Sequence, residues 1–297
     1  MKNVLLIINP VSGQKRIQPK LFDIVDELCK AGCNVTVHTT THRGHATELA
    51  LSATLAGYDT IICCGGDGTL NETLTGLCIS KGNEHIALGY IPCGSTNDFA
   101  DTLGLDNEPI IQIQNIIKGN MTTLDVGCFN SKRYFSYIAS FGAFTSVTYS
   151  TSQDLKNTFG HFAYIMEGVK DLTKIKPIEA TVIANGKEYS GKYALGAVSN
   201  TKSVAGIVKL KDEIVDLTDG LFEVLLIKYP EDIIDLSDIL IGGSQSDFSS
   251  DVFEFFRASE ITFRFKEPTP WTLDGEKASA AKNADIRAIK QAVKLYK

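Results

Sequence analysis

The sequence predicts an α/β fold, with a Rossmann-like parallel-sheet domain over residues 1–125 and a β-sandwich domain over residues 126–285. Up to Asp125, short apolar strands alternate with helical patterns, which is the rhythm of a doubly wound parallel sheet. After Asp125 this rhythm gives way to extended segments separated by turn residues. Residues 286–297 are candidates to rejoin the first domain, although periodicity alone does not assign them.

The first domain is expected to contain four short strands, each followed by a helical pattern. The strands lie at 4–8, 35–39, 60–64 and 86–91, and the helices at 21–28, 48–55, from about 70, 97–103 and 109–117. The strand at 60–64 is almost wholly apolar, as expected when helices cover both faces of a sheet. The parallel arrangement follows because each strand is separated from the next by a helix.

The second domain is expected to be mainly β. Asn185-Gly186 separates two alternating segments and is typical of a type I′ hairpin turn. Further extended segments lie at 129–141, 221–227, 252–256, 261–265 and 271–273, with helices at 162–172 and 233–241.

Composition excludes some classes of protein. The net charge of -6 argues against nucleic acid as the main partner, because duplex binding depends on basic residues that neutralise phosphates. The seven cysteines show no zinc-site spacing, which favours a reducing, cytoplasmic compartment. No apolar stretch approaches the roughly 20 residues that span a bilayer.

The strongest motif is Gly-Gly-Asp-Gly-Thr-Leu-Asn-Glu at 65–72, between the strand at 60–64 and the next helix. Parallel sheets bind ligands at the carboxyl ends of their strands. Glycines let the backbone approach a phosphate, and a helix N-terminus offers free N–H groups to it. Asp67 would add a carboxylate where phosphate and magnesium meet. The alternative is a glycine-rich turn in which Asp67 and Thr69 serve as helix caps.

Two further loops follow strands of the same sheet. One is Asn-Pro-Val-Ser-Gly at 9–13, and the other is Pro-Cys-Gly-Ser-Thr-Asn-Asp at 92–98. Each loop alone has the composition of an ordinary turn. Three such loops after three parallel strands are expected to meet at one rim of the sheet.

Together these segments resemble the diacylglycerol kinase catalytic-domain family, whose bacterial members are soluble lipid kinases related to sphingosine and ceramide kinases. The resemblance covers nearly the whole chain and includes the segments 40–46, 124–127, 219–222 and 273–276. It implies a nucleotide domain followed by a β-sandwich, with ATP in the cleft between them. It also implies transfer of the terminal phosphate of ATP to a lipid hydroxyl, with magnesium.

The resemblance implies roles for individual residues. The ATP-contacting positions would be Asn9, Pro10, Val11, Ser12, Gly13, Thr40, Gly65, Gly66, Asp67, Gly68, Thr69, Leu70, Asn71 and Ser95. Glu276 would be the general base that takes the proton of the lipid hydroxyl, a task that suits a carboxylate. The sequence leaves open whether Asp67 takes this role instead.

The resemblance also implies a magnesium site. Its ligands would be the Asp219 carboxylate and the main-chain oxygens of Asp216 and Leu221, since magnesium prefers oxygen ligands. Asp98 and Asp125 would join Asp67 in a supporting acidic network. The family often carries Pro-x-Ala just before the Asp-Gly pair, whereas this chain has Glu-Ile-Val at 213–215, which leaves the local geometry open.

Several functional questions stay open at this stage. A kinase resembling NAD kinases shares the Gly-Gly-Asp-Gly core, and a nucleotide-binding regulator without catalysis is a third reading. The lipid acceptor, expected at the membrane surface, could be diacylglycerol, phosphatidylglycerol or an undecaprenol-like alcohol. We expect a cytoplasmic enzyme that associates peripherally with membranes during turnover, and exposed sandwich edges suit a homodimer.

Overall fold

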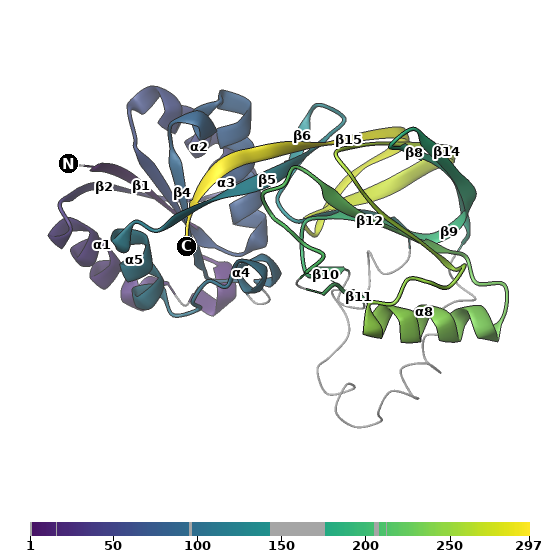
Figure 1. Ribbon diagram of the computed structural model, residues 1–297. Helices are drawn as coiled ribbons and strands as arrows, with labels where there is room; N and C mark the ends of the chain where they lie inside the picture. The colour runs from purple at the N-terminus through teal and green to yellow at the C-terminus, as the bar shows by residue number, and fades with distance from the viewer. Residues whose placement is uncertain (1, 16, 95–96, 143–175, 205–207, 212) are drawn as a thin grey trace.

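The chain has two halves that share long strands (Figure 1). The computed structural model describes residues 2–15, 17–94, 97–142, 176–204, 208–211 and 213–297. Ser95 and the helix predicted at 162–172 lie outside these residues. The predicted α/β half followed by a largely β half is confirmed.

The first half is built on parallel strands in the order β4-β3-β1-β2. Their bounds are Lys2–Ile8 for β1, Cys33–Thr39 for β2, Thr60–Gly65 for β3 and Ala87–Pro92 for β4. The strands β3 and β4 are buried along their whole length, because neighbours lie on both sides and helices on both faces. β2 is the edge strand and is the most exposed of the four.

Helices pack on both faces of this sheet (Figure 1). They are α1 (Leu21–Lys30) with α5 (Pro109–Lys118) on one face, and α2 (His45–Ala56) with α3 (Asp67–Ser80) on the other. Leu6 belongs to the core beneath α1 and α5, whereas Leu5 and Ile7 belong to the core beneath α2 and α3. Because successive side chains of a strand point to opposite faces of the sheet, β1 contributes side chains to both cores. Short helices complete this half: η1 (Ser12–Lys15), η2 (Gln18–Lys20), η3 (Gly82–Glu84) and α4 (Asp98–Leu103).

The second half is a sandwich whose two layers share strands. Its main strands are β7 (Ile138–Gly142), β8 (Ile178–Ala184), β9 (Lys187–Ser199), β12 (Phe222–Lys228), β13 (Phe253–Ala258) and β14 (Glu260–Leu273). The long strands β9 and β14 each pair with β8 near one end and with β7 near the other. The layers thereby enclose an aromatic core around Phe141, Phe263 and Trp271.

Most of the turns and strands predicted for the second half are present in the structure. Asn185 and Gly186 have φ of 51° and 72° and join β8 to β9, as the hairpin prediction required. The segments predicted at 261–265 and 271–273 are one strand, β14, because the register shifts between them without breaking the pairing with β15. The helix predicted at 233–241 is α8 (Ile233–Gln245), and β10 (Ser203–Val204) pairs with β11 (Val208–Lys209).

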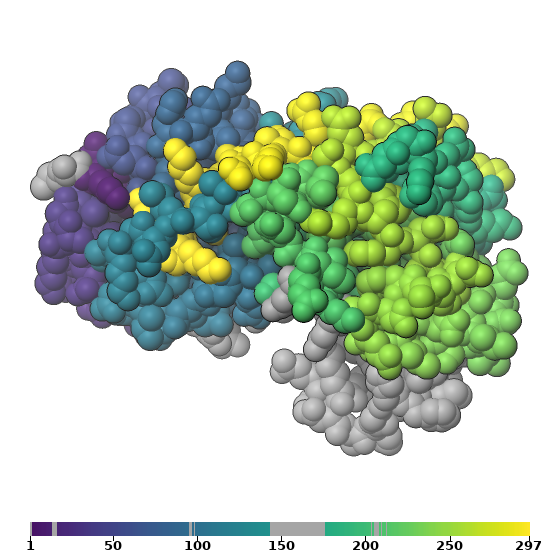
Figure 2. Space-filling model, viewed as in Figure 1, coloured from purple at the N-terminus to yellow at the C-terminus, as the bar shows by residue number. Residues whose placement is uncertain are grey.

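One strand, β15 (Glu276–Tyr296), crosses both halves. It pairs with β14 in the sandwich, with β5 (Met121–Phe129) along the junction, and with β4 at Leu295. β6 (Arg133–Phe135) pairs with β5. Figure 2 shows this C-terminal segment, in yellow, at the surface of both halves. All described strands except β10 and β11, which pair only with each other, therefore form one sheet that continues from the sandwich into the parallel region. The domain boundary at residue 125 stays a prediction.

Candidate functional site

Three loops meet at the carboxyl ends of β1, β3 and β4. The Asn9 side-chain amide donates a hydrogen bond to the Thr69 hydroxyl, at 3.0 Å. The Ser12 hydroxyl donates to the Cys93 carbonyl oxygen, at 3.1 Å. These two contacts tie the loop after β1 to the loops after β3 and β4. The structure thus brings these loops, all of which carry predicted phosphate-binding residues, to one rim.

Glycines allow the loops to approach this closely. A Cβ atom on Gly13 would lie 1.8 Å from the Cys93 carbonyl oxygen, and the φ of Gly13 is +49°. A Cβ atom on Gly94 would lie 2.7 Å from the Gly66 Cα atom and 2.6 Å from Asn97 Oδ1. The rim is therefore lined by backbone, which is the surface that phosphate oxygens require.

Helix α3 begins at Asp67, earlier than the sequence pattern indicated. The amides of Thr69 and Leu70 bond to the Gly66 carbonyl, so the Asp-Gly-Thr segment forms the first turn of the helix. Asp67 is half-buried there, with its Oδ1 3.5 Å from the Tyr90 hydroxyl. Burial and the nearby Asp67 carboxylate raise the pKa of Tyr90, so this phenol stays protonated and able to donate. The Leu70 side chain is in the core.

Asn71 connects the motif to the other half of the molecule. Its buried amide donates to Asp274 Oδ2 at 2.7 Å and to the Tyr134 carbonyl at 3.0 Å. The predicted contact of Asn71 with ATP stays a prediction, since both of these recorded partners lie outside the phosphate rim. In this structure the side chain fixes α3 to the sandwich.

Asp274 is a residue whose importance the sequence did not reveal. Its buried carboxylate accepts hydrogen bonds from the Ser136 amide and hydroxyl, at 2.6 and 2.7 Å, and from the amides of Tyr137 and Ile138, each at 3.0 Å. Burial raises the pKa of Asp274, while these amide donors lower it. Asp274 and Gly275 both have positive φ and form the turn between β14 and β15. The partners of Asp274 at residues 136–138 lie 136 to 138 positions away in the sequence, beyond any local pattern.

Glu276 follows this turn and faces the start of α3. Its Oε1 lies 3.5 Å from the position of a Cβ atom on Gly68. Its Oε2 forms an ion pair with the guanidinium of Arg43, in the loop between β2 and α2. The Glu276 side chain is 40 % exposed, so solvent can reach it. The structure therefore brings the predicted base next to the predicted phosphate site, and Arg43 is a neighbour that sequence reasoning missed.

A second acidic group lies where β5, β15 and the loop before β12 meet. The fully buried Asp125 carboxylate accepts hydrogen bonds from the amides of Gly220 and Gln291, each at 2.5 Å. Burial raises the pKa of Asp125, and the nearby carboxylates of Asp219 and Asp216 raise it further. The structure thus brings together three acids that the sequence assigned to the metal site or its surroundings.

The predicted magnesium ligands were tested against this geometry. Asp219 forms an ion pair with Arg257, and its Oδ1 accepts from the Leu221 amide at 2.8 Å. Hydrogen bonds from Thr218 lower the pKa of Asp216. Among the described residues, no group of three or more His, Cys, Asp or Glu side chains is arranged so that it could hold a metal ion. The predicted set of one side chain and two main-chain oxygens has the donor type that a hard cation takes, but both Asp219 oxygens have partners in the chain, Arg257 and the Leu221 amide.

The other predicted positions are placed as follows. The Thr40 amide bonds to the Ile8 carbonyl and extends the pairing of β1 with β2. Val11 is 77 % exposed beside the rim, next to Pro10. The Gly65 carbonyl accepts from the Cys93 amide. Asp98 is the first residue of α4.

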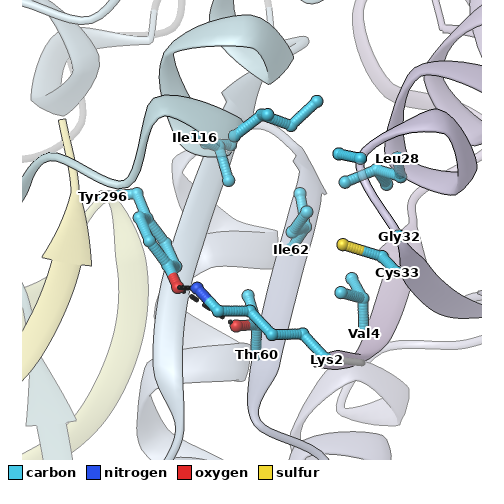
Figure 3. A pocket seen from close by; sticks show the side chains of 11 residues that line it. Lys2, Val4, Leu28, Gly32, Cys33, Thr60, Ile62, Ile116 and Tyr296 are labelled. Carbon is cyan, nitrogen blue, oxygen red and sulfur yellow. Dashed lines mark hydrogen bonds between the residues drawn. The ribbon is translucent and has the colours of Figure 1, made fainter.

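A cavity of about 370 Å³ lies at the opposite end of the parallel strands (Figure 3). It is lined by the start of β1, the end of α1 and the end of α5. In it, the Tyr296 hydroxyl is 3.3 Å from both Lys2 Nζ and Thr60 Oγ1. None of its lining residues is a predicted site residue, so the cavity is separate from the rim.

None of the helices in the described part of the chain is long and apolar enough to cross a membrane.

Known proteins resemble this chain in sequence and in fold. Residues 3–129 match the family model described as the diacylglycerol kinase catalytic domain. The chain is 33 % identical over 279 residues to a diacylglycerol kinase of Bacillus subtilis (strain 168), covering 93 % of this chain and 90 % of that protein. It is 35 % identical over 227 residues to one of Staphylococcus saprophyticus, covering 76 % and 73 %.

The fold has solved counterparts. A crystal structure of a diacylglycerol kinase from Bacillus anthracis (strain Sterne) superposes with a TM-score of 0.75 and 23 % identity, covering 99 % of this chain and 96 % of that one. This likeness concerns the fold, whereas the sequence matches over most of the chain concern the family. On those matches, the chain belongs to the diacylglycerol kinase family, a family of lipid kinases.

Proposed function

We propose that this protein transfers the terminal phosphoryl group of ATP to the hydroxyl of diacylglycerol or a similar lipid alcohol, with magnesium. The observation that carries the proposal is the position of Glu276. This carboxylate comes from the sandwich half, yet it lies against Gly68 at the N-terminus of α3, beside the rim of three glycine-bearing loops. A phosphate donor and a hydroxyl acceptor could therefore meet between the two halves.

The rim is suited to a triphosphate. The first turn of α3 directs the positive end of the helix dipole toward the rim, where it favours an anion. The close contacts at Gly13, Gly66 and Gly94 leave backbone as the surface of the rim. The hydroxyls of Ser12 and Thr69 belong to the same loops. Catalysis of phosphoryl transfer rests mainly on such positioning and charge stabilisation.

In the proposed reaction, Glu276 accepts the proton of the lipid hydroxyl as that oxygen attacks the terminal phosphorus. The bond from this phosphorus to the bridging oxygen breaks, and ADP leaves. Glu276 is preferred over Asp67 as the base because it extends from the half opposite the rim, whereas Asp67 lies within the first turn of α3, on the side proposed for the phosphates. Asp219 and the main-chain oxygens of Asp216 and Leu221 would hold magnesium, which supplies positive charge to the phosphates.

The direct test is a phosphotransfer assay with labelled ATP. Vesicles carrying diacylglycerol, phosphatidylglycerol or an undecaprenol-like alcohol are offered in parallel with sphingosine and NAD. We expect label in a lipid product, abolition by a chelator, and stimulation by anionic lipid. Label in NAD alone would reverse the assignment, and nucleotide binding without transfer to any acceptor would indicate a non-catalytic regulator. Association as a homodimer stays a prediction.

A further inference from the structure

Two consecutive residues of α3 hold segments from opposite sides of the site. Asn71 binds Asp274 in the turn that precedes Glu276. Glu72 binds the start of α2, with Oε1 accepting from the Gly44 amide at 2.8 Å and Oε2 from the Ala46 amide at 3.2 Å. The first contact fixes the position of Glu276, and the second fixes the loop that carries Arg43. Helix α3 therefore positions both Arg43 and Glu276, and their side chains meet beside its N-terminus.

The result is the ion pair between Arg43 and Glu276. Oε2 of the carboxylate faces the guanidinium, while Oε1 faces Gly68 on α3. The Arg43 side chain is 71 % exposed and the Glu276 side chain 40 %. An ion pair this exposed contributes little to stability. Its position beside the phosphate rim therefore requires an explanation other than the stability of the fold.

We propose that Arg43 is a phosphate-binding residue that holds Glu276 while the nucleotide is absent and moves to the terminal phosphate when ATP binds. This inference rests on the proposed function. A guanidinium binds carboxylate and phosphate with the same planar fork, so the two anions compete for it. The terminal phosphate carries more charge than Glu276 and enters beside Gly68. Transfer of Arg43 to the phosphate leaves Oε2 free to accept the hydroxyl proton, so binding of the donor makes this oxygen available to the acceptor.

Nucleotide affinity gives the first test, because it needs no lipid and no turnover. We would measure the binding of ATP and ADP, each with magnesium, to wild type, Arg43→Gln and Arg43→Lys. Arg264→Gln is the matched control, since Arg264 is an exposed arginine on β14. We expect Arg43→Gln to weaken ATP binding about tenfold and ADP binding less than twofold, with Arg43→Lys between it and wild type. The thermal midpoints of all variants should stay close to that of wild type.

Kinetics in two backgrounds gives the second test. With Glu276 present, Arg43→Gln should lower kcat/KM about 100-fold, the scale for one donor that stabilises transition-state charge. In a Glu276→Gln background, Arg43→Gln should still weaken ATP binding, because the contact with phosphate is independent of the base. Unchanged affinity for ATP would overturn the proposal, as would equal weakening of ATP and ADP. If instead Glu276→Gln kept full activity, the assignment of Glu276 as the base would fail. The affinities for ATP and ADP would still show whether Arg43 binds the terminal phosphate.

Discussion

Two acids that are separated by one residue have opposite surroundings. Asp274 is buried and saturated with donors from the chain, whereas Glu276 is accessible and faces Arg43 and the N-terminus of α3. A structural anchor requires the first environment and a proton acceptor requires the second. The two environments suit the roles proposed for the Asp-Gly-Glu motif, in which Asp274 anchors the turn and Glu276 would accept a proton.

Glu276→Gln is expected to lower kcat by a factor of about 10² to 10⁴, because the amide cannot accept the hydroxyl proton. The fold should persist, since the exposed pair with Arg43 adds little to stability. Turnover with labelled ATP and the thermal midpoint would be measured together. Glu260→Gln, at an exposed position of β14, is the matched control. Near-normal kcat in the folded variant would remove Glu276 from the base role.

Glu223 makes a pH-dependent contribution to stability. Its carboxylate is buried on β12, and among the described residues neither oxygen accepts a hydrogen bond, although Arg257 Nε lies 3.3 Å from Oε1. Burial raises the pKa of Glu223 to about 7, against the opposing effect of Arg257. The folded state then binds a proton that the unfolded state releases above an ordinary pKa of 4.5. Stability is therefore lost as the pH rises from about 4.5 to about 7.

Glu223→Gln should remove this loss. Relative to wild type, the variant is expected to gain up to about 3 kcal/mol in free energy of unfolding between pH 5 and pH 8, at 1.36 kcal/mol for each unit of pKa shift. Urea unfolding with a chelator present, at both pH values, measures the difference. If the free energies of unfolding of the two proteins differed by the same amount at both pH values, this result would contradict the raised pKa of Glu223.

At the scale of elements, the loops of the rim depend on close backbone approach. Gly13→Ala is expected to abolish ATP binding, because its Cβ would lie 1.8 Å from the Cys93 carbonyl oxygen and force the loops apart. Gly104→Ala is the control, since Gly104 has a φ of +68° but no atom within 4 Å of the added Cβ. It should cost only about 1 kcal/mol of left-handed backbone strain and leave ATP affinity unchanged. Equal ATP affinity in both variants would show that the loop contact is dispensable.

The sequence predicted the parallel half well because β1, β3 and β4 are short apolar runs and each strand of that half is followed by a helix. It did not predict β15, since residues 276–296 are rich in Ala and Lys and lack the pattern of a strand. Pairing with β5 on one side and β14 on the other overrides this weak propensity. The loops of the rim could be located from the sequence, because each follows a predicted strand. The contacts of Asp274, Arg43 and Glu72 could not, because they join segments that are distant in the sequence.

At the scale of the molecule, β15 is expected to make the two halves unfold together. Leu74→Ala removes a fully buried side chain of α3 in the first half and should cost about 2–5 kcal/mol. Trp271, the one tryptophan in the chain, lies in the core of the sandwich and reports on the second half. In Leu74→Ala, the urea midpoint measured by Trp271 fluorescence should fall together with the midpoint measured by far-UV circular dichroism. Ile79→Ala, at an exposed position of α3, is the control, and an unchanged tryptophan midpoint in Leu74→Ala would show independent halves.

The same strand has a consequence for biosynthesis. β15 emerges from the ribosome after every other described strand, yet it pairs with β4 and supplies the Gln291 amide to Asp125. Until it arrives, the nascent parallel sheet has an open border at β4 and a carboxylate that lacks one of its donors. Completion of the parallel half must therefore wait until β15 has been synthesised, and a growing polypeptide of this kind is a natural client for chaperones that shield sheet borders.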